Sequence, residues 1–128
     1  MTTGKLLDTN AVIALQAGDS NLLRFLETNA VILPCIVLGE LYYGAQRSER
    51  TDANIAVIDD LAQSSAVLVC DGSTARFYGE IKNALRLKGR PIPENDIWIA
   101  ALARQHSLTL ITRDAHFDDI RDLSVARW

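Results

Sequence analysis

The sequence predicts an α/β domain of three layers (α/β/α), with helices on both faces of a short, mostly parallel sheet. Short apolar runs of strand length alternate along the chain with segments of helical periodicity, which is typical of parallel sheets covered by helices. The first apolar run ends on a carboxylate, Asp8. Because open α/β sheets place their chemistry at the carboxyl ends of the strands, we expect Asp8 to mark the functional edge of the sheet.

Composition indicates one globular domain over residues 1–128. The chain is 48% hydrophobic and 23% charged, which is typical of a globular protein. Asp8 interrupts the first apolar run, so we expect no signal peptide, and no run reaches the ~18–20 apolar residues of a membrane span. We therefore expect a cytoplasmic protein without membrane contact, in which Cys35 and Cys70 are small, buried, reduced side chains rather than a disulfide.

In the first half of the chain, apolar periodicity predicts two strands and four helices. Thr9 and Asn10 suit the N-cap of the first helix, and Ser20 suits that of the second. The expected strands are 5–8 and 31–33. The expected helices are 11–15, ending at Gly18, then 20–29, 35–44 and 52–63.

The second half predicts three strands and two helices. A helix begins at Ser73 and runs to about Lys88, and Asn95 or Asp96 opens the last helix, which ends near Gln105. Between them, 89–93 is a rigid connection because it contains two prolines. The expected strands are 67–69, 108–111 and a weak 123–126.

Four acids lie at or close to predicted strand–helix junctions: Asp8, Glu40, Asp96 and Asp114. Asp8 and Asp96 could be helix caps, and Asp114 a turn residue. Glu40 resists such an explanation because its neighbours are mostly apolar and no basic residue occurs between 30 and 46. Four carboxylates brought together would repel one another, and Mg²⁺ or Mn²⁺ would relieve that repulsion. Two such ions ~3.5–4 Å apart can activate a water against a phosphodiester, which is nuclease chemistry.

The net charge of −3 does not exclude a polyanionic substrate, because neutralising these four acids would leave a charge of +1. Zinc is unsupported, because the two cysteines and two histidines show no recognised ligand spacing.

Four segments in series carry a family resemblance that spans essentially the whole chain. They are Leu6-Leu7-Asp8-Thr9-Asn10, Leu38-Gly39-Glu40-Leu41-Tyr42-Tyr43-Gly44, Pro93-Glu94-Asn95-Asp96-Ile97-Trp98-Ile99-Ala100-Ala101 and Leu110-Ile111-Thr112-Arg113-Asp114-Ala115-His116-Phe117. In these segments the chain resembles a PIN domain, and specifically the VapC-type toxin ribonucleases of bacterial toxin–antitoxin pairs. Each segment is weakly specific alone, whereas the four in order are strongly specific.

The resemblance implies an endoribonuclease that depends on Mg²⁺ or Mn²⁺. The residues that match the family's acidic metal-binding positions are Asp8, Glu40, Asp96 and Asp114. Thr112 and Asn10 match polar positions that support the site, and Glu94 is expected to lie outside it. Relatives often replace the fourth acid by Asn, so Asp118 stays open as the alternative to Asp114. Whether one or two ions bind is also open.

The resemblance further implies that metal-activated water attacks RNA. Arg113 is expected to hold a neighbouring phosphate, and a basic track is expected to flank the site. The track consists of Lys82, Arg86, Lys88 and Arg90. The alternative is that these residues form an ordinary solvent-exposed helix face with no role in binding RNA. His116 is expected to be a turn residue in preference to a general base.

Toxins of this family are held inactive by a small antitoxin and commonly form homodimers, so both partners are expected here. An apolar stripe could form the antitoxin groove. It consists of Leu22, Leu23, Phe25 and Leu26, with Tyr42 and Tyr43 nearby. Tyr42, Tyr43 and Trp98 are expected to be core or interface residues in preference to base-stacking ones.

Two other classes of protein fit the sequence less well: a phosphatase or phosphoacceptor α/β domain, and a catalytically inactive binding module. A haloacid-dehalogenase-type phosphatase needs an acid two residues after its nucleophile, where this chain has Asn10. A phosphoacceptor receiver domain needs an adjacent acidic pair and a late lysine, where this chain has Asp8 alone and Thr112-Arg113. A catalytically inactive PIN-like binding module would have no use for four clustered acids. The sequence names neither the RNA nor the antitoxin.

Overall fold

A parallel sheet forms the middle layer of the computed structural model, which describes residues 4–27 and 31–128. In that part of the chain the sheet has five strands in the order β3-β2-β1-β4-β5, and every neighbouring pair is parallel. The strands are β1 (Lys5–Leu7), β2 (Val31–Pro34), β3 (Ala66–Leu68), β4 (Thr109–Ile111) and β5 (Val125–Ala126). The predicted α/β/α class with a parallel sheet is therefore confirmed.

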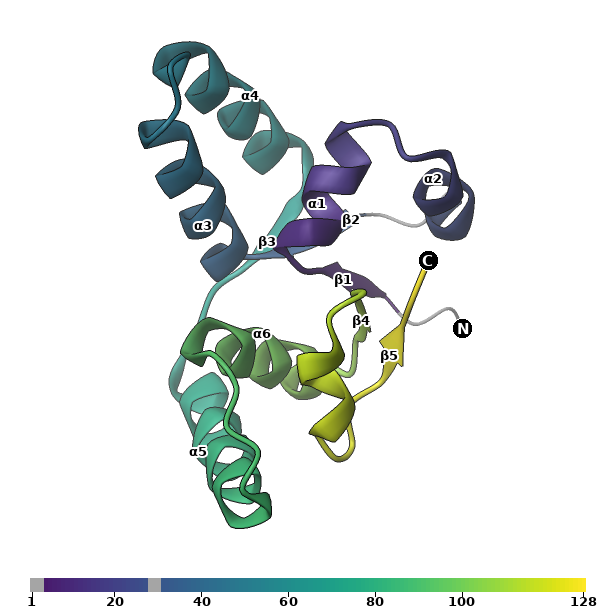
Figure 1. Ribbon diagram of the computed structural model, residues 1–128, viewed down its shortest axis with the longest axis vertical. Coiled ribbons are helices and arrows are strands. Elements are labelled where there is room, and N and C mark those ends of the chain that lie inside the picture. Colours follow the sequence, from purple (N-terminus) through teal and green to yellow (C-terminus); the bar gives the residue numbers. More distant parts are fainter. Residues whose placement is uncertain (1–3, 28–30) are drawn as a thin grey trace.

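Helices cover both faces of this sheet (Figure 1). One face carries α1 (Thr9–Gln16), α2 (Ser20–Leu26), α3 (Cys35–Gln46) and α4 (Thr51–Ser64). The other carries α5 (Gly72–Lys88), α6 (Glu94–Gln105) and the 3₁₀ helix η1 (Ala115–Asp119). From β1 to β3, each new strand is added on the same side of the sheet, whereas β4 and β5 are added on the other side of β1. Because crossovers are right-handed, this reversal moves the later helices to the opposite face.

The carboxyl ends of β1 and β4 form the topological switch point of the sheet. From β1 the chain continues to β2 on one side, whereas from β4 it continues to β5 on the other. Such points are where open α/β sheets bind ligands. Because Leu7 is paired with Ile111, the residues that follow them, Asp8 and Thr112, emerge side by side.

Five predicted helix starts, those of α1, α2, α4, α5 and α6, were late by one or two residues. Asp8, not Thr9 or Asn10, caps α1, and Asp19, not Ser20, caps α2 through the Leu22 N–H at 3.0 Å. In both cases an aspartate one position earlier supplies the acceptor that the first turn needs. Helix α6 begins at Glu94 after Pro93, whose fixed φ favours entry into a helix.

The remaining differences are local. The segment after Asp114 forms η1, where a turn was expected. Cys35 and Cys70 are free thiols, but neither is buried as expected, because Cys35 is half-buried and Cys70 is exposed. The predicted end of the second helix, Asn29, lies outside the described residues. In the described ranges, no helix combines the length and apolar character that crossing a membrane requires.

Candidate metal centre

Asp8 is held by two hydrogen bonds where β1 turns into α1. Its Oδ1 accepts the Ala11 N–H at 2.9 Å, and its Oδ2 accepts the hydroxyl of Thr112. The side chain is 5% exposed, and this burial is the main cause that raises the pKa of Asp8. Asp114 and Asp96 raise that pKa further, whereas the two hydrogen bonds oppose the rise. Asp8 is thus both a helix cap and a charged member of an acidic cluster.

Thr112 ties the ends of β1 and β4 together. It is fully buried, donates to Asp8, and accepts the Asp114 N–H at 2.9 Å. The Asp114 carboxylate caps η1 by accepting the His116 N–H, also at 2.9 Å. One hydroxyl therefore fixes one carboxylate directly and positions the backbone of a second.

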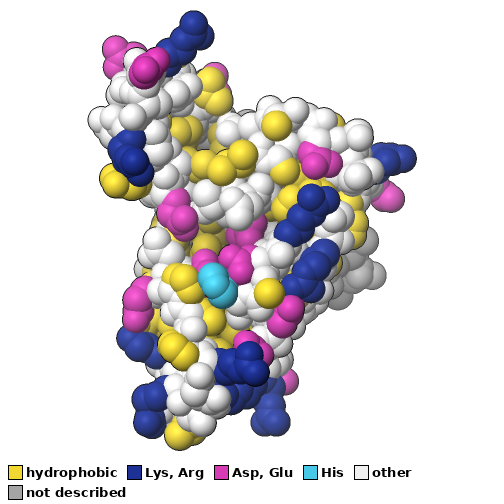
Figure 2. Space-filling model, viewed as in Figure 1, with side chains coloured by type: hydrophobic (Ala, Val, Ile, Leu, Met, Phe, Trp, Pro, Cys, Tyr) yellow, Lys and Arg dark blue, Asp and Glu magenta, His cyan; other side chains and the backbone are white. Residues whose placement is uncertain are grey.

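His116 lies between two of the predicted acids. Its Nδ1 is 2.9 Å from Asp96 Oδ2 and 3.1 Å from Asp114 Oδ1. The contact with Asp96 is the main cause that raises the pKa of His116. Burial is the main cause that raises the pKa of Asp96, and Asp114 adds to it. Figure 2 shows a histidine against acidic side chains at the centre of this face, with Lys and Arg on either side.

Glu40 approaches the cluster from α3, on the opposite face of the sheet from α6. It is half-buried, and burial is the first cause that raises the pKa of its carboxyl, followed by repulsion from Asp96 and Asp8. The Thr9 hydroxyl offsets this in part. Within the described residues, no lysine or arginine pairs with any of the four predicted acids.

The donor set fits a hard divalent cation. One ligand atom each from Asp96, Asp114 and His116 can be chosen so that all lie within 4.8 Å of one another. Carboxylate oxygens suit Mg²⁺ and Mn²⁺, and an imidazole nitrogen favours Mn²⁺ of the two. Asp8 and Glu40 add negative charge beside these three, which raises the local attraction for a cation.

The other predicted site residues lie in different surroundings. Asn10 is exposed in the first turn of α1. The Arg113 guanidinium lies 4.3 Å from the centre of the Trp128 ring and donates to the Trp128 carbonyl oxygen at 2.8 and 3.0 Å. Asp118, the alternative fourth acid, forms an ion pair with Arg127 at 2.6 Å. The structure therefore brings Asp114, rather than Asp118, to the cluster.

The two basic residues predicted from the middle of the chain lie on α5. Lys82 forms an ion pair with Glu94 at 2.6 Å, and Arg86 donates to Asn83 at 3.0 Å. Among the described residues, neither forms a hydrogen bond or ion pair with the acidic cluster.

Sequence reasoning missed His116 as a member of the cluster. The sequence contained one signal for this role, because His116 follows Asp114 by two residues and is therefore within reach of the Asp114 carboxylate. Its second partner, Asp96, is 20 residues away, and only the packing of η1 against α6 brings them together.

The fold and the cluster define a class: an α/β domain whose parallel sheet presents clustered carboxylates at its switch point. Residues 5–123 match the PIN domain family, and the chain belongs to this family, on its VapC branch.

Three relatives illustrate that membership. Ribonuclease VapC2 of Haemophilus influenzae is 36% identical over 127 residues, covering 96% of each chain. The tRNA(fMet)-specific endonuclease VapC of Shigella flexneri is 31% identical, covering 80% of this chain and 79% of that one. The crystal structure of VapBC2 from Rickettsia felis bound to a DNA fragment from their promoter contains a chain that superposes with a TM-score of 0.87 at 29% identity. That match covers 97% of this chain and 98% of the other.

Proposed function

We propose that this protein is a metal-dependent endoribonuclease that acts in the cytoplasm as the toxin of a toxin–antitoxin pair. The observation that carries the proposal is the convergence of Asp8, Glu40 and Asp96 with Asp114 at the switch point, without a lysine or arginine partner among the described residues. The ribonuclease names of relatives that match most of the chain support it.

The acids Asp8, Glu40, Asp96 and Asp114 would hold Mg²⁺ or Mn²⁺. When bound, the ion supplies an activated water and neutralises negative charge that develops at the phosphodiester. Asp8 is preorganised for this role, because Thr112 and the Ala11 N–H fix both of its oxygens. The raised pKa values of Asp8, Glu40 and Asp96 couple cation binding to loss of protons.

An antitoxin and a second copy of the chain are the proposed partners. Of the predicted apolar stripe, Leu22 and Leu26 are buried in the core, and Leu23 is 47% exposed. Ile13 and Tyr43, 51% and 65% exposed, add further apolar surface on α1 and α3. A relative crystallised as a VapBC complex supports a protein partner. Expression of this chain alone is expected to arrest growth, and co-expression of a small neighbouring reading frame to relieve the arrest.

The activity is tested by incubating the purified protein with RNA and mapping new 5′ ends. Chelation is expected to abolish cleavage, and added Mg²⁺ or Mn²⁺ to restore it. Initiator tRNA belongs in the RNA panel, because a relative is named for that substrate. Cleavage that persists in excess chelator would contradict the metal-dependent mechanism.

The fourth acid is tested by a matched pair of variants. Asp114→Ala is expected to lower kcat by about 100-fold or more, because it removes a carboxylate from the cluster. Asp118→Ala is expected to leave kcat within about twofold, since it removes only an exposed ion pair to Arg127. The reverse order of effects would assign the fourth position to Asp118.

A further inference from the structure

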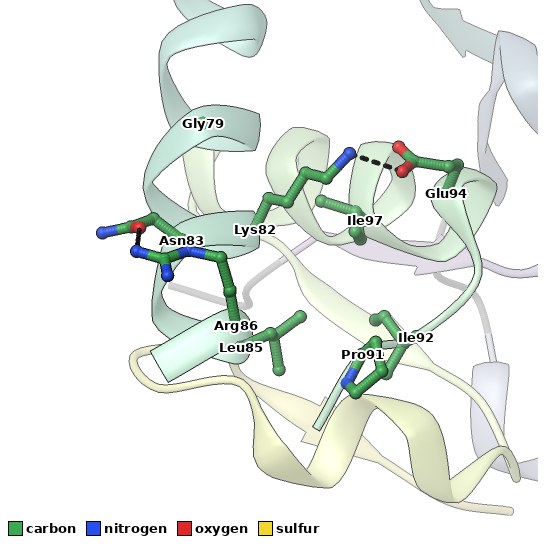
Figure 3. Close-up of a pocket in the computed structure, with 9 residues that line it drawn as sticks. All are labelled: Gly79, Lys82, Asn83, Leu85, Arg86, Pro91, Ile92, Glu94 and Ile97. Carbon is green, nitrogen blue, oxygen red and sulfur yellow. Dashed lines mark hydrogen bonds and ion pairs between the residues drawn. The ribbon is translucent and has the colours of Figure 1, made fainter. Parts of the chain in front are cut away.

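A pocket of about 500 Å³ lies between α5 and the start of α6 (Figure 3). Its floor is apolar and includes Leu85, Ile92 and Ile97, while Lys82, Arg86 and Glu94 contribute its polar side chains. Gly89 ends α5 in the left-handed region at φ 68°, and the chain then turns into the proline-containing segment that walls the pocket. Its volume is within the range of small-molecule sites.

The charge of this pocket is positive on balance. Glu94 is neutralised by Lys82 at 2.6 Å and also accepts the Tyr78 hydroxyl. Arg86 uses one guanidinium nitrogen on Asn83, and its other donors have no partner in residues 4–27 and 31–128. A guanidinium with free donors beside an apolar floor suits a ligand that carries both a phosphate and a flat ring.

The pocket lies next to the acidic cluster. Glu94 lines the pocket and Asp96 belongs to the cluster, and both are in the first turn of α6. Helix geometry places their Cα atoms roughly 5 Å apart. Ile97, directly after Asp96, forms part of the floor. One polymer could therefore occupy both places at once.

We propose that this pocket binds one nucleotide of the RNA, next to the phosphodiester that is cleaved. The base lies on Leu85, Ile92 and Ile97, and Arg86 contacts the phosphate or stacks on the ring. Single-stranded RNA is recognised in this way, by unstacked bases held against apolar, aromatic or guanidinium surfaces. This inference rests on the proposed ribonuclease function and adds the position from which a preference for one base would arise.

Filling the pocket tests the proposal. Gly79 lines it, and a Cβ at Gly79 would meet nothing within 4 Å, so Gly79→Phe adds a ring at the pocket without a backbone clash. Gly72→Phe is the matched control, because Gly72 has equal space on the same helix but does not line the pocket. Binding of labelled single-stranded RNA is measured by fluorescence anisotropy in chelator, where no cleavage is expected.

Gly79→Phe is expected to raise the Kd for RNA about tenfold, which is the contribution of one stacked base, and Gly72→Phe to leave it unchanged. With metal added, KM for RNA is expected to rise in Gly79→Phe and to stay unchanged in Gly72→Phe. An unchanged Kd in a folded Gly79→Phe protein overturns the pocket proposal. Absence of RNA cleavage by the wild type would instead overturn the proposed function.

Abasic RNA identifies the occupant. A single abasic residue, moved stepwise along the RNA, is expected to weaken wild-type binding at one position and to have no further effect there in Gly79→Phe. If no position behaves in this way, the pocket does not hold a base of the RNA. Submillimolar binding of a free nucleoside monophosphate without any abasic effect would assign the pocket to a free nucleotide and overturn the proposal.

The positive charge is tested by Arg86→Gln, with Arg76→Gln as the control on the same helix. Arg76 is exposed and does not line the pocket. Loss of one phosphate contact is expected to reduce the slope of log K against log salt by about 0.7 in Arg86→Gln alone. Equal slopes in the two variants would exclude a phosphate contact by Arg86 and leave only its stacking on the ring, which Gly79→Phe tests.

Discussion

Two acids on the same turn of α6 have opposite surroundings. Glu94 is exposed, and its hydrogen bond with Lys82 is the main cause that lowers the pKa of its carboxyl. Asp96, two residues later, lies where burial raises its pKa, and its partner is a histidine shared with Asp114. Glu94 is therefore paired with a lysine, whereas the only basic partner of Asp96 among the described residues is a partly exposed histidine. This contrast supports the proposal that Asp96, and not Glu94, binds a metal ion.

The largest expected effect is on catalysis. Asp96→Asn is expected to lower kcat for RNA cleavage by more than about 100-fold at saturating Mn²⁺, because it removes a proposed metal ligand. Glu94→Gln is expected to change kcat by less than about threefold, although KM can shift because Lys82 is released. Rates at saturating RNA measure the contrast. If both variants are folded and lose kcat to a similar extent, the expected difference in function between Asp96 and Glu94 is contradicted.

A smaller effect is expected on the stability of the metal-free protein. The pKa of Asp96 is higher in the folded protein than its unfolded value of 3.8. Ionisation of Asp96 therefore destabilises the fold as the pH rises above 3.8, and the loss of stability is complete above the folded pKa. In chelator at pH 8.5, Asp96→Asn is therefore expected to raise Tm by about 2–4 °C. Glu94→Gln, which loses a favourable pair, is expected not to raise it. Thermal unfolding measures both, and a lower Tm for Asp96→Asn would contradict the repulsion.

The smallest effect concerns His116. Its folded pKa is raised above 6.5, so its protonated form stabilises the fold below that pH, and this contribution is lost as pH rises through the folded pKa. His116→Gln is expected to lower Tm by roughly 1–2 °C at pH 5.5, because the side chain is 46% exposed and solvent screens the pair. The difference should vanish by pH 8.5 in chelator. A difference that is constant with pH would indicate lost packing rather than lost charge.

The general architecture could be predicted because it depends on repeated local patterns. Apolar runs, separated by segments with a helical period, specify strands and crossovers, and the right-handed rule then limits the arrangement. Glu40 could be singled out because a carboxylate among apolar neighbours is costly unless it is paired or bound to a cation. Asp8 could be placed at the sheet edge because it ends the first strand.

Other features depend on contacts between distant parts of the chain. His116 reaches Asp96 only when η1 packs on α6, and no local pattern encodes that approach. The pairing of Lys82 with Glu94 across the two-proline connection was equally hidden. The helix starts were misplaced for a different reason: several adjacent polar residues can each cap a helix, and small differences in geometry select one.

The bond between Thr112 and Asp8 also bears on the order in which the molecule folds. It joins residues 104 positions apart and depends on β4 being docked beside β1. Contacts of such separation carry a large loop-closure cost and form slowly compared with local helices. The first strand and its helices can collapse earlier, but the acids of the first and last quarters of the chain meet only when β4 docks. Nuclease competence should therefore be among the last properties that the folding chain acquires.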